Sequence, residues 1–460
     1  MTQFKSLPGF REFYPEDKAV QNHLFDVWRR TSRRFGFREW DAPVLEELEL
    51  FTEKSGEEIV SQLFNFVDKG DRAVTLRPEM TPSLARMVAA KAGSMRRPIK
   101  WFAIGENFRY EKQQKGRLRS FVQYNADILG EAGPAADAEA IALCVESLRG
   151  FGLREGEFCI RLSDRNLWFL FLESRGVPAD KVPGILSVVD KLERDKPEEL
   201  LKNAAAALAG TDCDPSFILE SVRGFVACDT FDKVRAFLGA GNAAVEARLK
   251  EWSELLGILG AMGLGGFIRV DMTIVRGLAY YTGFVFEAFQ LVGQGRALAG
   301  GGRYDNLVKK LGGPDMPAVG FGMGDVVLRN LLEDLKLLPG YHDAPDFYAI
   351  ILGEENRAEA LKDVSELRRA GLVIEYAFKD GKFGKLIQTA EQSGARHALV
   401  YGGDELAAGV VKVRDMKERR EIAVPRAHLI EAMRLIAEHG LPCDQPKPGC
   451  DRQGGCGCGH

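Results

Sequence analysis

The sequence predicts an α+β protein, with an antiparallel sheet core that carries a helical insertion and a separate C-terminal α/β domain. Three observations predict this fold class. Apolar and polar residues alternate strictly from Ile99 onward and again at 281–289, as they do in half-buried strands. Residues 165–262 are rich in Ala, Leu, Lys and Glu, which favour helices. After a short linker at 342–345, strand and helix patterns alternate regularly.

The chain begins with a predicted amphipathic helix at about 17–35, where Val20, Leu24 and Trp28 recur every four residues. An extended segment broken at Pro43 follows. We therefore expect a helix to precede the first strands of the sheet.

Two strands joined by a basic turn are predicted next, one running from Ile99 to Glu111 and the other starting at Phe121. On the second strand, Gln123, Asn125 and Asp127 share one face, because side chains alternate along a strand. The opposite face is apolar and belongs to the core. The polar face is therefore free to line a site.

We expect a first domain at 1–335 that contains the insertion at about 165–262, an α/β domain at 344–438, and a tail rich in Cys and Gly at 439–460. In the second domain, strands are predicted at 347–352, 372–378, 397–402 and 409–414, and helices at 355–369, 382–393 and 427–438. The composition of the tail indicates that it does not fold alone.

The composition is that of an ordinary soluble protein, with a formal net charge of −4 and a pI of about 6.0. A protein that coats nucleic acid carries a strong basic excess, so any contact with nucleic acid must be local. No apolar run approaches the roughly 20 residues that span a bilayer, and the first residues lack the apolar stretch of a secretory signal. Scattered cysteines fit a reducing compartment, so we expect a cytoplasmic protein.

Several common kinds of site are excluded by the motifs. The sequence has no G-x-x-x-x-G-K-[ST] phosphate loop. The glycine cluster at 320–324 is not a dinucleotide fingerprint, because Asp325 stands where glycine is required. Only His23 precedes residue 342, which argues against a histidine metal centre or a Ser-His-Asp triad in the first domain.

Four segments combine strand patterning with dense Arg, acidic and amide residues: TLRPEMTPSLAR (75–86), NFRYEKQQKGRLRSFVQYNADILG (107–130), VRGLAYYTGFVFEAF (275–289) and GGGRYDNLV (300–308). Buried arginine is costly unless an anion pairs with it. Arg109, Arg276 and Arg303 therefore indicate either structural ion pairs with acids such as Glu79, Glu111 and Asp127, or binding of phosphate and carboxylate.

These segments resemble the class II aminoacyl-tRNA synthetases and, within them, the histidine–tRNA ligase family. FGFREWDAP (35–43) is similar to the first motif of the class, and NFRYEKQQKGRLRSFVQ to the second. RGLAYYTG and GGRYDNL look like the two motifs that distinguish the histidine enzymes. The resemblance runs to about residue 436 and includes an anticodon-binding domain. It implies a homodimer with the Pro43 segment at the contact.

The resemblance implies that histidine is activated by ATP, with Mg²⁺, and then transferred to the 3′ end of tRNA(His). Positioning and charge neutralisation carry such a reaction. Arg109 matches the second-motif arginine that holds the α-phosphate, and Arg276 matches the family's arginine on its other side. Glu111 and Asp127 are the expected partners of ATP and Mg²⁺, a cation that prefers oxygen ligands.

A pocket for histidine must pair both nitrogens of an imidazole ring, since a buried polar group left unpaired is costly. Glu79 and Tyr281 are the candidates for the ring nitrogens, and Thr81 and Gln123 for the amino group. Tyr280 and Met80 are expected to line the same pocket. The alternative for the two tyrosines is that they are core aromatics.

The basic turn is expected to face the acceptor end of tRNA, because in the family this loop does so. The candidate contacts are Gln114, Lys115, Arg117 and Arg119, whose side chains suit phosphates and base edges. The alternative is a solvated charged hairpin.

One position departs from the class pattern. The third motif places an arginine on the helix after the glycine-rich strand, and this chain has Val327 there. Arg329 lies about 200° around the helix and is not an obvious substitute. Two alternatives stay open: the regulatory subunit of ATP phosphoribosyltransferase, which binds histidine without charging tRNA, and a tRNA-binding or sensor module without chemistry. The presence of Arg109, Arg276 and the C-terminal domain favours the ligase.

The tail holds further candidate metal ligands: Cys443, Cys450, Cys456, Cys458 and His460. They could bind zinc, although the C-x-C spacing is not the usual one. The favoured interpretation is a disordered tail with free thiols and no firm metal site.

Overall fold

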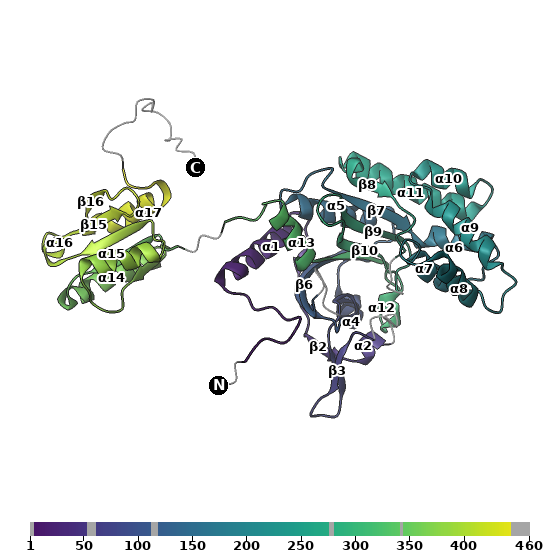
Figure 1. Ribbon diagram of the computed structural model, residues 1–460, viewed down its shortest axis with the longest axis horizontal. Helices are drawn as coiled ribbons and strands as arrows, with labels where there is room; N and C mark the ends of the chain where they lie inside the picture. The colour runs from purple at the N-terminus through teal and green to yellow at the C-terminus, as the bar shows by residue number, and fades with distance from the viewer. Residues whose placement is uncertain (1–3, 53–60, 112–117, 276–279, 341–343, 443–460) are drawn as a thin grey trace. The chain divides into compact units, whose positions relative to one another are not determined.

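The computed structural model describes residues 4–52, 61–111, 118–275, 280–340 and 344–442. The chain divides into two compact units, Met1–Pro339 and Gly340–His460 (Figure 1). Each unit has a sheet and a core of its own. None of the helices in these ranges is long and apolar enough to cross a bilayer.

The first unit is built on an eight-stranded sheet. In spatial order its strands are β1 (Arg38–Glu39), β5 (Ile99–Phe108), β6 (Ser120–Leu129), β11 (Ala318–Gly324), β10 (Ala297–Arg303), β9 (Phe284–Gln290), β7 (Phe158–Asp164) and β8 (Ile268–Val270). The strands from β5 to β7 pair antiparallel, as predicted, whereas the two edge strands β1 and β8 pair parallel to their neighbours.

The two faces of this sheet are covered differently. One face packs against α1 (Pro15–Arg34), α5 (Pro134–Arg149) and α13 (Asp325–Asp334), with Trp28, Tyr124 and Phe321 in the shared core. The other face packs against α4 (Thr81–Lys91) and α12 (Leu307–Lys310). The predicted split of β6 is confirmed: Tyr124 lies in the first core, while Asp127 faces the second and bonds to Tyr304 there.

The sequence did not predict a small three-stranded sheet beside this core, in the order β2 (Leu45–Glu47), β4 (Ala73–Leu76) and β3 (Phe64–Val67), with α2 (Glu49–Thr52) next to it. These strands are short and mostly exposed, so they lack the alternation that reveals a half-buried strand. The predicted continuation of the first long strand to Glu111 is wrong, since β5 ends at Phe108.

The predicted insertion contains helices α6 (Arg165–Ser174), α7 (Val182–Val189), α8 (Pro197–Ala207), α9 (Pro215–Val226), α10 (Phe231–Leu238) and α11 (Ala243–Ala261). They form the teal group beside β7 and β8 in Figure 1. Several begin at capping side chains that accept backbone N–H groups, for example Asp164 at α6 and Asn242 at α11.

The second unit has a five-stranded sheet in the order β13 (Ile374–Tyr376), β12 (Phe347–Ile351), β14 (His397–Tyr401), β15 (Val410–Asp415) and β16 (Glu421–Pro425). Helices α14 (Arg357–Arg369) and α17 (Leu429–His439) share one apolar cluster with the sheet, and α15 (Phe383–Gln392) shares a second cluster on the opposite face. The predicted α/β pattern is confirmed. The sequence prediction did not include β16 and the short α16 (Gly403–Ala407).

Candidate active site

Several of the candidate residues lie on or directly beside the antiparallel pair β5–β6, and the register of that pair separates Asp127 from Arg109. Trp101 lies opposite Asp127, and Gly105 lies opposite Gln123. Beyond the ladder, the backbone N–H of Arg109 donates to the carbonyl of Arg119. About eight residues of strand therefore separate the levels of Asp127 and Arg109, which at 3.3 Å per residue is roughly 26 Å. These two side chains cannot hold the same phosphate group.

Glu79 and Tyr280 form a buried hydrogen-bonded pair, which the neighbouring rings of Tyr280 and Tyr304 link to Asp127. The phenol of Tyr280 donates to Oε2 of Glu79 at 2.7 Å, and the side chain of Thr81 is a further partner of this phenol. Burial, and then the charge of Glu79, raise the pKa of Tyr280 well above its ordinary value. The phenol therefore remains a proton donor. The structure thus brings together three of the residues that the sequence predicts for histidine.

Asp127 belongs to the same buried end. The phenol of Tyr304 donates to its Oδ1 at 2.6 Å, while Oδ2 is buried without a hydrogen-bond partner among the described residues. Burial raises the pKa of Asp127 to about 7, and the bond from Tyr304 opposes that shift. The rings of Tyr280, Tyr281 and Tyr304 lie beside one another, with centroids 5.1 and 5.9 Å apart. Asp127 is therefore a carboxyl group in a tyrosine-lined, nearly dry environment.

Glycines on the neighbouring strands leave room for these side chains. A Cβ atom at Gly320 would lie 1.9 Å from Oδ1 of Asp127, and one at Gly322 would lie 2.6 Å from Nε2 of Gln123. A Cβ atom at Gly302 would lie 3.0 Å from the ring of Tyr281. The glycine-rich strands β10 and β11 are consequently a steric requirement of the site.

The middle of the strand pair contains buried amides. Nδ2 of Asn107 donates to Oε1 of Gln123 at 3.4 Å. The side-chain oxygens of Asn107 and Asn125 are buried and have no hydrogen-bond partner among the described residues. Buried polar atoms normally have partners, so unpaired acceptors here favour a ligand that supplies donors.

The other end of the pair is a cavity of about 200 Å³. Its lining combines apolar side chains with one cation and one carboxylate: Arg109, Glu111, Leu118, Phe121, Gly324, Val326 and Val327. The guanidinium of Arg109 lies 5.3 Å from the centroid of the Phe121 ring, and its Nε donates to the carbonyl of Pro78 at 3.0 Å. The remaining donors of this half-buried guanidinium suit a phosphate.

Val327 lines this cavity, and Arg329 does not replace the expected arginine. Arg329 forms ion pairs of 2.7 Å with Asp17 and Glu333 and is absent from the cavity lining. The position of the third-motif arginine therefore presents an apolar wall, as the helical spacing predicts.

Arg303 is structural. Its Nε donates to Oδ1 of Asp137 at 3.1 Å, and its terminal nitrogens donate to the carbonyls of Glu131 and Gly133. The structural alternative predicted from sequence is confirmed for this arginine, although its partner is Asp137 and not one of the three acids named above. The sequence did not reveal this partner because Asp137 lies in α5, far from Arg303 in the sequence.

The insertion is bonded to the segment that carries Tyr280 and Tyr281. The backbone N–H of Arg165, the first residue of α6, donates to the carbonyl of Gly283 at 3.0 Å, directly after the Tyr280–Tyr281 pair. Asp164 caps α6 and also accepts from Arg248 and Trp252 of α11, at 2.6 and 2.7 Å. These bonds link α6 and α11 to the segment that follows the tyrosines.

The structure also gives the positions of the candidates Met80 and Arg119. Met80 is fully buried, and a Cβ atom at Gly105 would meet its sulfur at 2.8 Å, so its side chain packs against β5. The guanidinium of Arg119 lies 4.2 Å from the Tyr110 ring centroid. Other predicted residues lie outside the described ranges: Arg276, the turn residues Gln114, Lys115 and Arg117, and the tail residues Cys443, Cys450, Cys456, Cys458 and His460.

The sequence missed residues whose signal was present. Tyr304 stands inside GGGRYDNLV, and Phe121 lies on the same face of β6 as Gln123, Asn125 and Asp127. Within the described ranges, no group of three or more His, Cys, Asp or Glu side chains is arranged to hold a metal ion. Glu111 lies with Arg109 in the lining of the cavity.

Comparison with solved structures defines the class. The fold is similar to apo histidyl-tRNA synthetase of S. aureus, with a TM-score of 0.72 at 23% identity over 94% of this chain and 100% of that one. It is also similar to histidyl-tRNA synthetase of Nostoc sp., with a TM-score of 0.74 at 24% identity over 94% and 99%. The fold is that of the aminoacyl-tRNA synthetases to which these proteins belong.

Sequence comparison defines the family. The histidyl-tRNA synthetase family model matches residues 9–325, and an anticodon-binding domain model matches residues 346–435. The histidine–tRNA ligase of Opitutus terrae is 52% identical over 434 residues, which cover 94% of this chain and 98% of that protein. The chain belongs to the histidyl-tRNA synthetase family.

Proposed function

We propose that this chain is a histidine–tRNA ligase, which activates histidine with ATP and transfers it to the 3′ end of tRNA(His). One observation supports this most strongly: a buried cluster of carboxyl groups and tyrosines lies at one end of the strand pair β5–β6, and a cavity lined by Arg109 lies at the other. The carboxylate of histidine attacks the α-phosphate of ATP, which releases pyrophosphate and forms histidyl-adenylate. A ribose hydroxyl of the tRNA then takes the histidyl group and releases AMP.

We assign the imidazole ring to the deep end. A neutral imidazole offers one N–H donor and one acceptor nitrogen. The unpaired oxygen of Asp127 fits the donor, and the phenol of Tyr281 fits the acceptor. Asp127 is thus proposed as a histidine ligand, whereas the sequence predicts it for ATP, because the strand distance removes it from the phosphate end.

The amino group of histidine lies between the two ends in this assignment. Glu79 supplies the negative charge, and Thr81 and Gln123 supply oxygens, from positions adjoining the Tyr280 phenol and the buried amides. The carboxylate then points along β6 toward Arg109. Arg276, which the sequence predicts on the other side of the α-phosphate, completes the charge neutralisation.

We assign the adenine ring to the cavity of Phe121, Val326 and Val327. The flat ring of Phe121 and the two valines form apolar walls that suit a purine. Arg109 then faces the phosphates. Glu111 would hold Mg²⁺, which supplies charge neutralisation on the phosphates when bound.

We further propose a cytoplasmic homodimer that binds tRNA, with its catalytic domain at 1–335, its anticodon-binding domain at 344–438 and a tail at 439–460. Val44 and Leu45, which follow Pro43, and Phe66 and Val67 of the small sheet expose apolar side chains. Exposed apolar side chains support a contact between subunits. Acceptor-stem contact is assigned to Gln114, Lys115, Arg117 and Arg119.

The rival candidate is a regulatory subunit that binds histidine without charging tRNA. The Arg109 cavity and the C-terminal unit favour the ligase. The deciding experiment is ATP–pyrophosphate exchange with each of the 20 amino acids, followed by charging of tRNA(His). Exchange with histidine alone is expected. Histidine binding without exchange would transfer support to the regulatory subunit.

A further inference from the structure

The cavity beside Arg109 has no cation in its wall on the α13 side. Gly324, Val326 and Val327 form that wall. The β- and γ-phosphates carry most of the charge of ATP, and proteins that bind them commonly supply an arginine or a lysine. Arg329 does not supply one here, because two carboxylates hold its guanidinium. A cation for these phosphates must therefore come from elsewhere in the chain.

The segment 9–11 is bonded to the β6 side of this cavity. The backbone N–H groups of Arg119 and Ser120 donate to the carbonyl of Gly9, at 3.0 and 3.2 Å. These two residues directly precede Phe121, which lines the cavity. Gly9 has a φ of +89°, and a Cβ atom there would lie 2.8 Å from Cγ of Arg119. Glycine is therefore required where the segment meets β6.

On the α13 side, Arg11 is bonded to the first residue of the helix. Its Nη2 donates to Oδ2 of Asp325 at 2.7 Å, and Oδ1 of this carboxylate accepts from the backbone N–H of Val122 at 3.0 Å. Asp325 stands between Gly324 and Val326, which both line the cavity. The segment thus joins the two sides of the cavity, and the guanidinium of Arg11 lies at its rim.

The guanidinium of Arg11 keeps donors for a ligand. Among the described residues, its one hydrogen bond is that from Nη2, and its Nε is buried there without a partner. The side chain as a whole is 21% exposed, so the group is open to solvent in part. A guanidinium that a carboxylate holds on one side can direct its remaining N–H groups to a phosphate.

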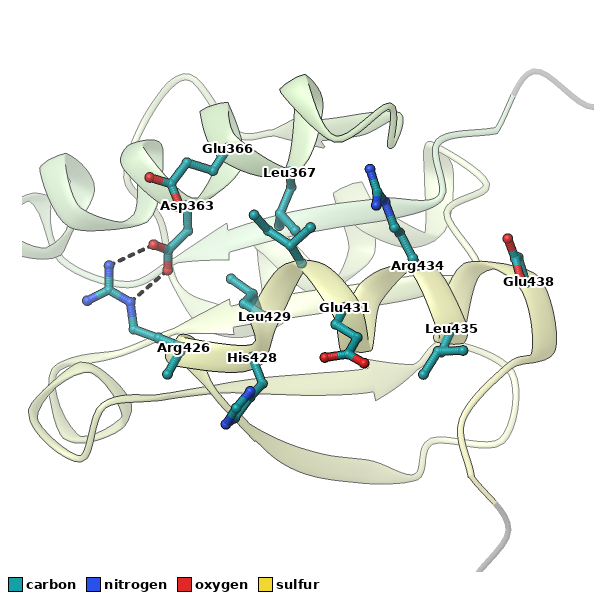
Figure 2. A pocket seen from close by; sticks show the side chains of 12 residues that line it. Asp363, Glu366, Leu367, Arg426, His428, Leu429, Glu431, Arg434, Leu435 and Glu438 are labelled. Atoms are coloured by element: carbon teal, nitrogen blue, oxygen red, sulfur yellow. Dashed lines mark hydrogen bonds and ion pairs between the residues drawn. The ribbon is translucent and has the colours of Figure 1, made fainter.

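Arg426 of the second unit shows what a closed, structural ion pair looks like. Figure 2 shows its guanidinium facing Asp363 in the groove between α14 and α17, where Nε and Nη2 donate to the two carboxylate oxygens at 2.8 and 2.7 Å. Its Nη2 also donates to Glu359 at 3.3 Å. Arg11, by contrast, is bonded to its carboxylate through a single nitrogen.

Aromatic contacts fix the position of Arg11. The ring of Phe10 meets that of Phe64 edge to face, with centroids 5.9 Å apart, and lies 6.3 Å from the ring of Phe108 at the end of β5. The guanidinium of Arg11 itself lies 4.9 Å from the centroid of the Phe13 ring. A side chain that is already ordered loses little further entropy when it binds a ligand.

We propose that Arg11 binds the terminal phosphates of ATP, in place of the arginine that the third motif lacks at Val327. This proposal rests on the function proposed above and adds a residue to its ATP site. The α-phosphate lies at Arg109 in that function, so the β- and γ-phosphates extend toward the rim, where pyrophosphate leaves. Asp325 is the positioning residue that holds the guanidinium at the rim.

The test is calorimetric titration of the full chain with ATP and with AMP at one Mg²⁺ concentration. Arg11→Ala should lower the affinity for ATP about 30-fold and leave that for AMP within about twofold, because AMP lacks the phosphates concerned. Asp325→Asn keeps the cation and should lower the affinity for ATP only about threefold. Val327→Arg added to Arg11→Ala should restore most of the affinity for ATP, because it places a guanidinium in the adjoining wall. Arg329→Ala is the matched control and should change neither affinity.

Wild-type affinity for ATP in Arg11→Ala would overturn the proposal, as would equal losses for ATP and AMP. Equal losses in Arg11→Ala and Asp325→Asn would show that the ion pair is only structural, and would also overturn it. So would a double variant that recovers no affinity for ATP. Histidine affinity should be unchanged in every variant, which shows that the fold is retained. A wild-type chain that binds ATP without exchange would instead defeat the proposed function, and the titrations would still decide the role of Arg11.

Discussion

The two ends of the β5–β6 pair differ in how far water reaches them. Asp127 and Glu79 are 2% and 4% exposed, and each accepts a hydrogen bond from a buried tyrosine. Arg109, by contrast, is half-buried beside an open cavity with an apolar lining. A dry end discriminates, because any polar group of the wrong substrate is left unpaired there. The open end, with the guanidinium of Arg109, suits phosphates. ATP must enter this end and pyrophosphate must leave it.

The largest effect is expected for Arg276→Ala. Loss of a guanidinium that acts on the transition state should lower the rate of ATP–pyrophosphate exchange by about 10³-fold or more, while histidine binding remains measurable. Arg329→Ala is the matched control, since Arg329 is engaged with Asp17 and Glu333. Normal exchange in Arg276→Ala would remove this residue from the reaction.

The next effect is expected at the dry end. Asp127→Asn keeps the shape but removes the charge and one acceptor oxygen. The KM for histidine should rise about 100-fold, with a smaller change in kcat, because a ground-state partner of the ring is lost. Glu79→Ala should also chiefly weaken histidine binding. Steady-state exchange at varied histidine concentration measures both. A fall in kcat with an unchanged KM for Asp127→Asn would contradict the assignment of histidine to the deep end and of the phosphates to the other end.

A smaller effect is expected for Tyr304→Phe. This change leaves Oδ1 of Asp127 without the donor that lies 2.6 Å away. Loss of one buried hydrogen bond should raise the histidine KM by about tenfold. Tyr401→Phe is the control, because this phenol is buried in the second unit and has no hydrogen-bond partner in the described residues. An equal KM for histidine in the two variants would mean that the hydrogen bond from Tyr304 does not position Asp127 for histidine.

The smallest expected effect is a pH dependence. Burial raises the pKa of Asp127 to about 7 from an ordinary value near 4. Between those values the folded chain holds a proton that the unfolded chain releases, so the stability due to this group is fully present below about pH 4 and is lost as pH rises through 7. The Tm of the ligand-free chain should therefore fall more between pH 5.5 and 8 in the wild type than in Asp127→Asn. Parallel pH profiles of Tm would contradict this.

Much of this contrast was accessible from the sequence. Period-2 alternation predicted the polar face of β6, and the family resemblance grouped Glu79, Thr81, Gln123, Tyr280 and Tyr281 in one histidine pocket. The sequence could not reveal that Asp127 and Arg109 stand at different ends, because that follows from the strand register. It also could not distinguish Arg303, held by a carboxylate from α5, from an arginine that faces a ligand. The exposed strands of the small sheet lack the burial that creates a readable pattern.

The central claim is that the deep end holds histidine independently of the phosphate end. Calorimetric titration of histidine without ATP, into the wild type, Asp127→Asn and Arg109→Ala, tests it most directly. We predict that Asp127→Asn lowers the affinity about 100-fold, while Arg109→Ala stays within a few-fold of the wild type. Retained affinity in Asp127→Asn together with its loss in Arg109→Ala would contradict the account.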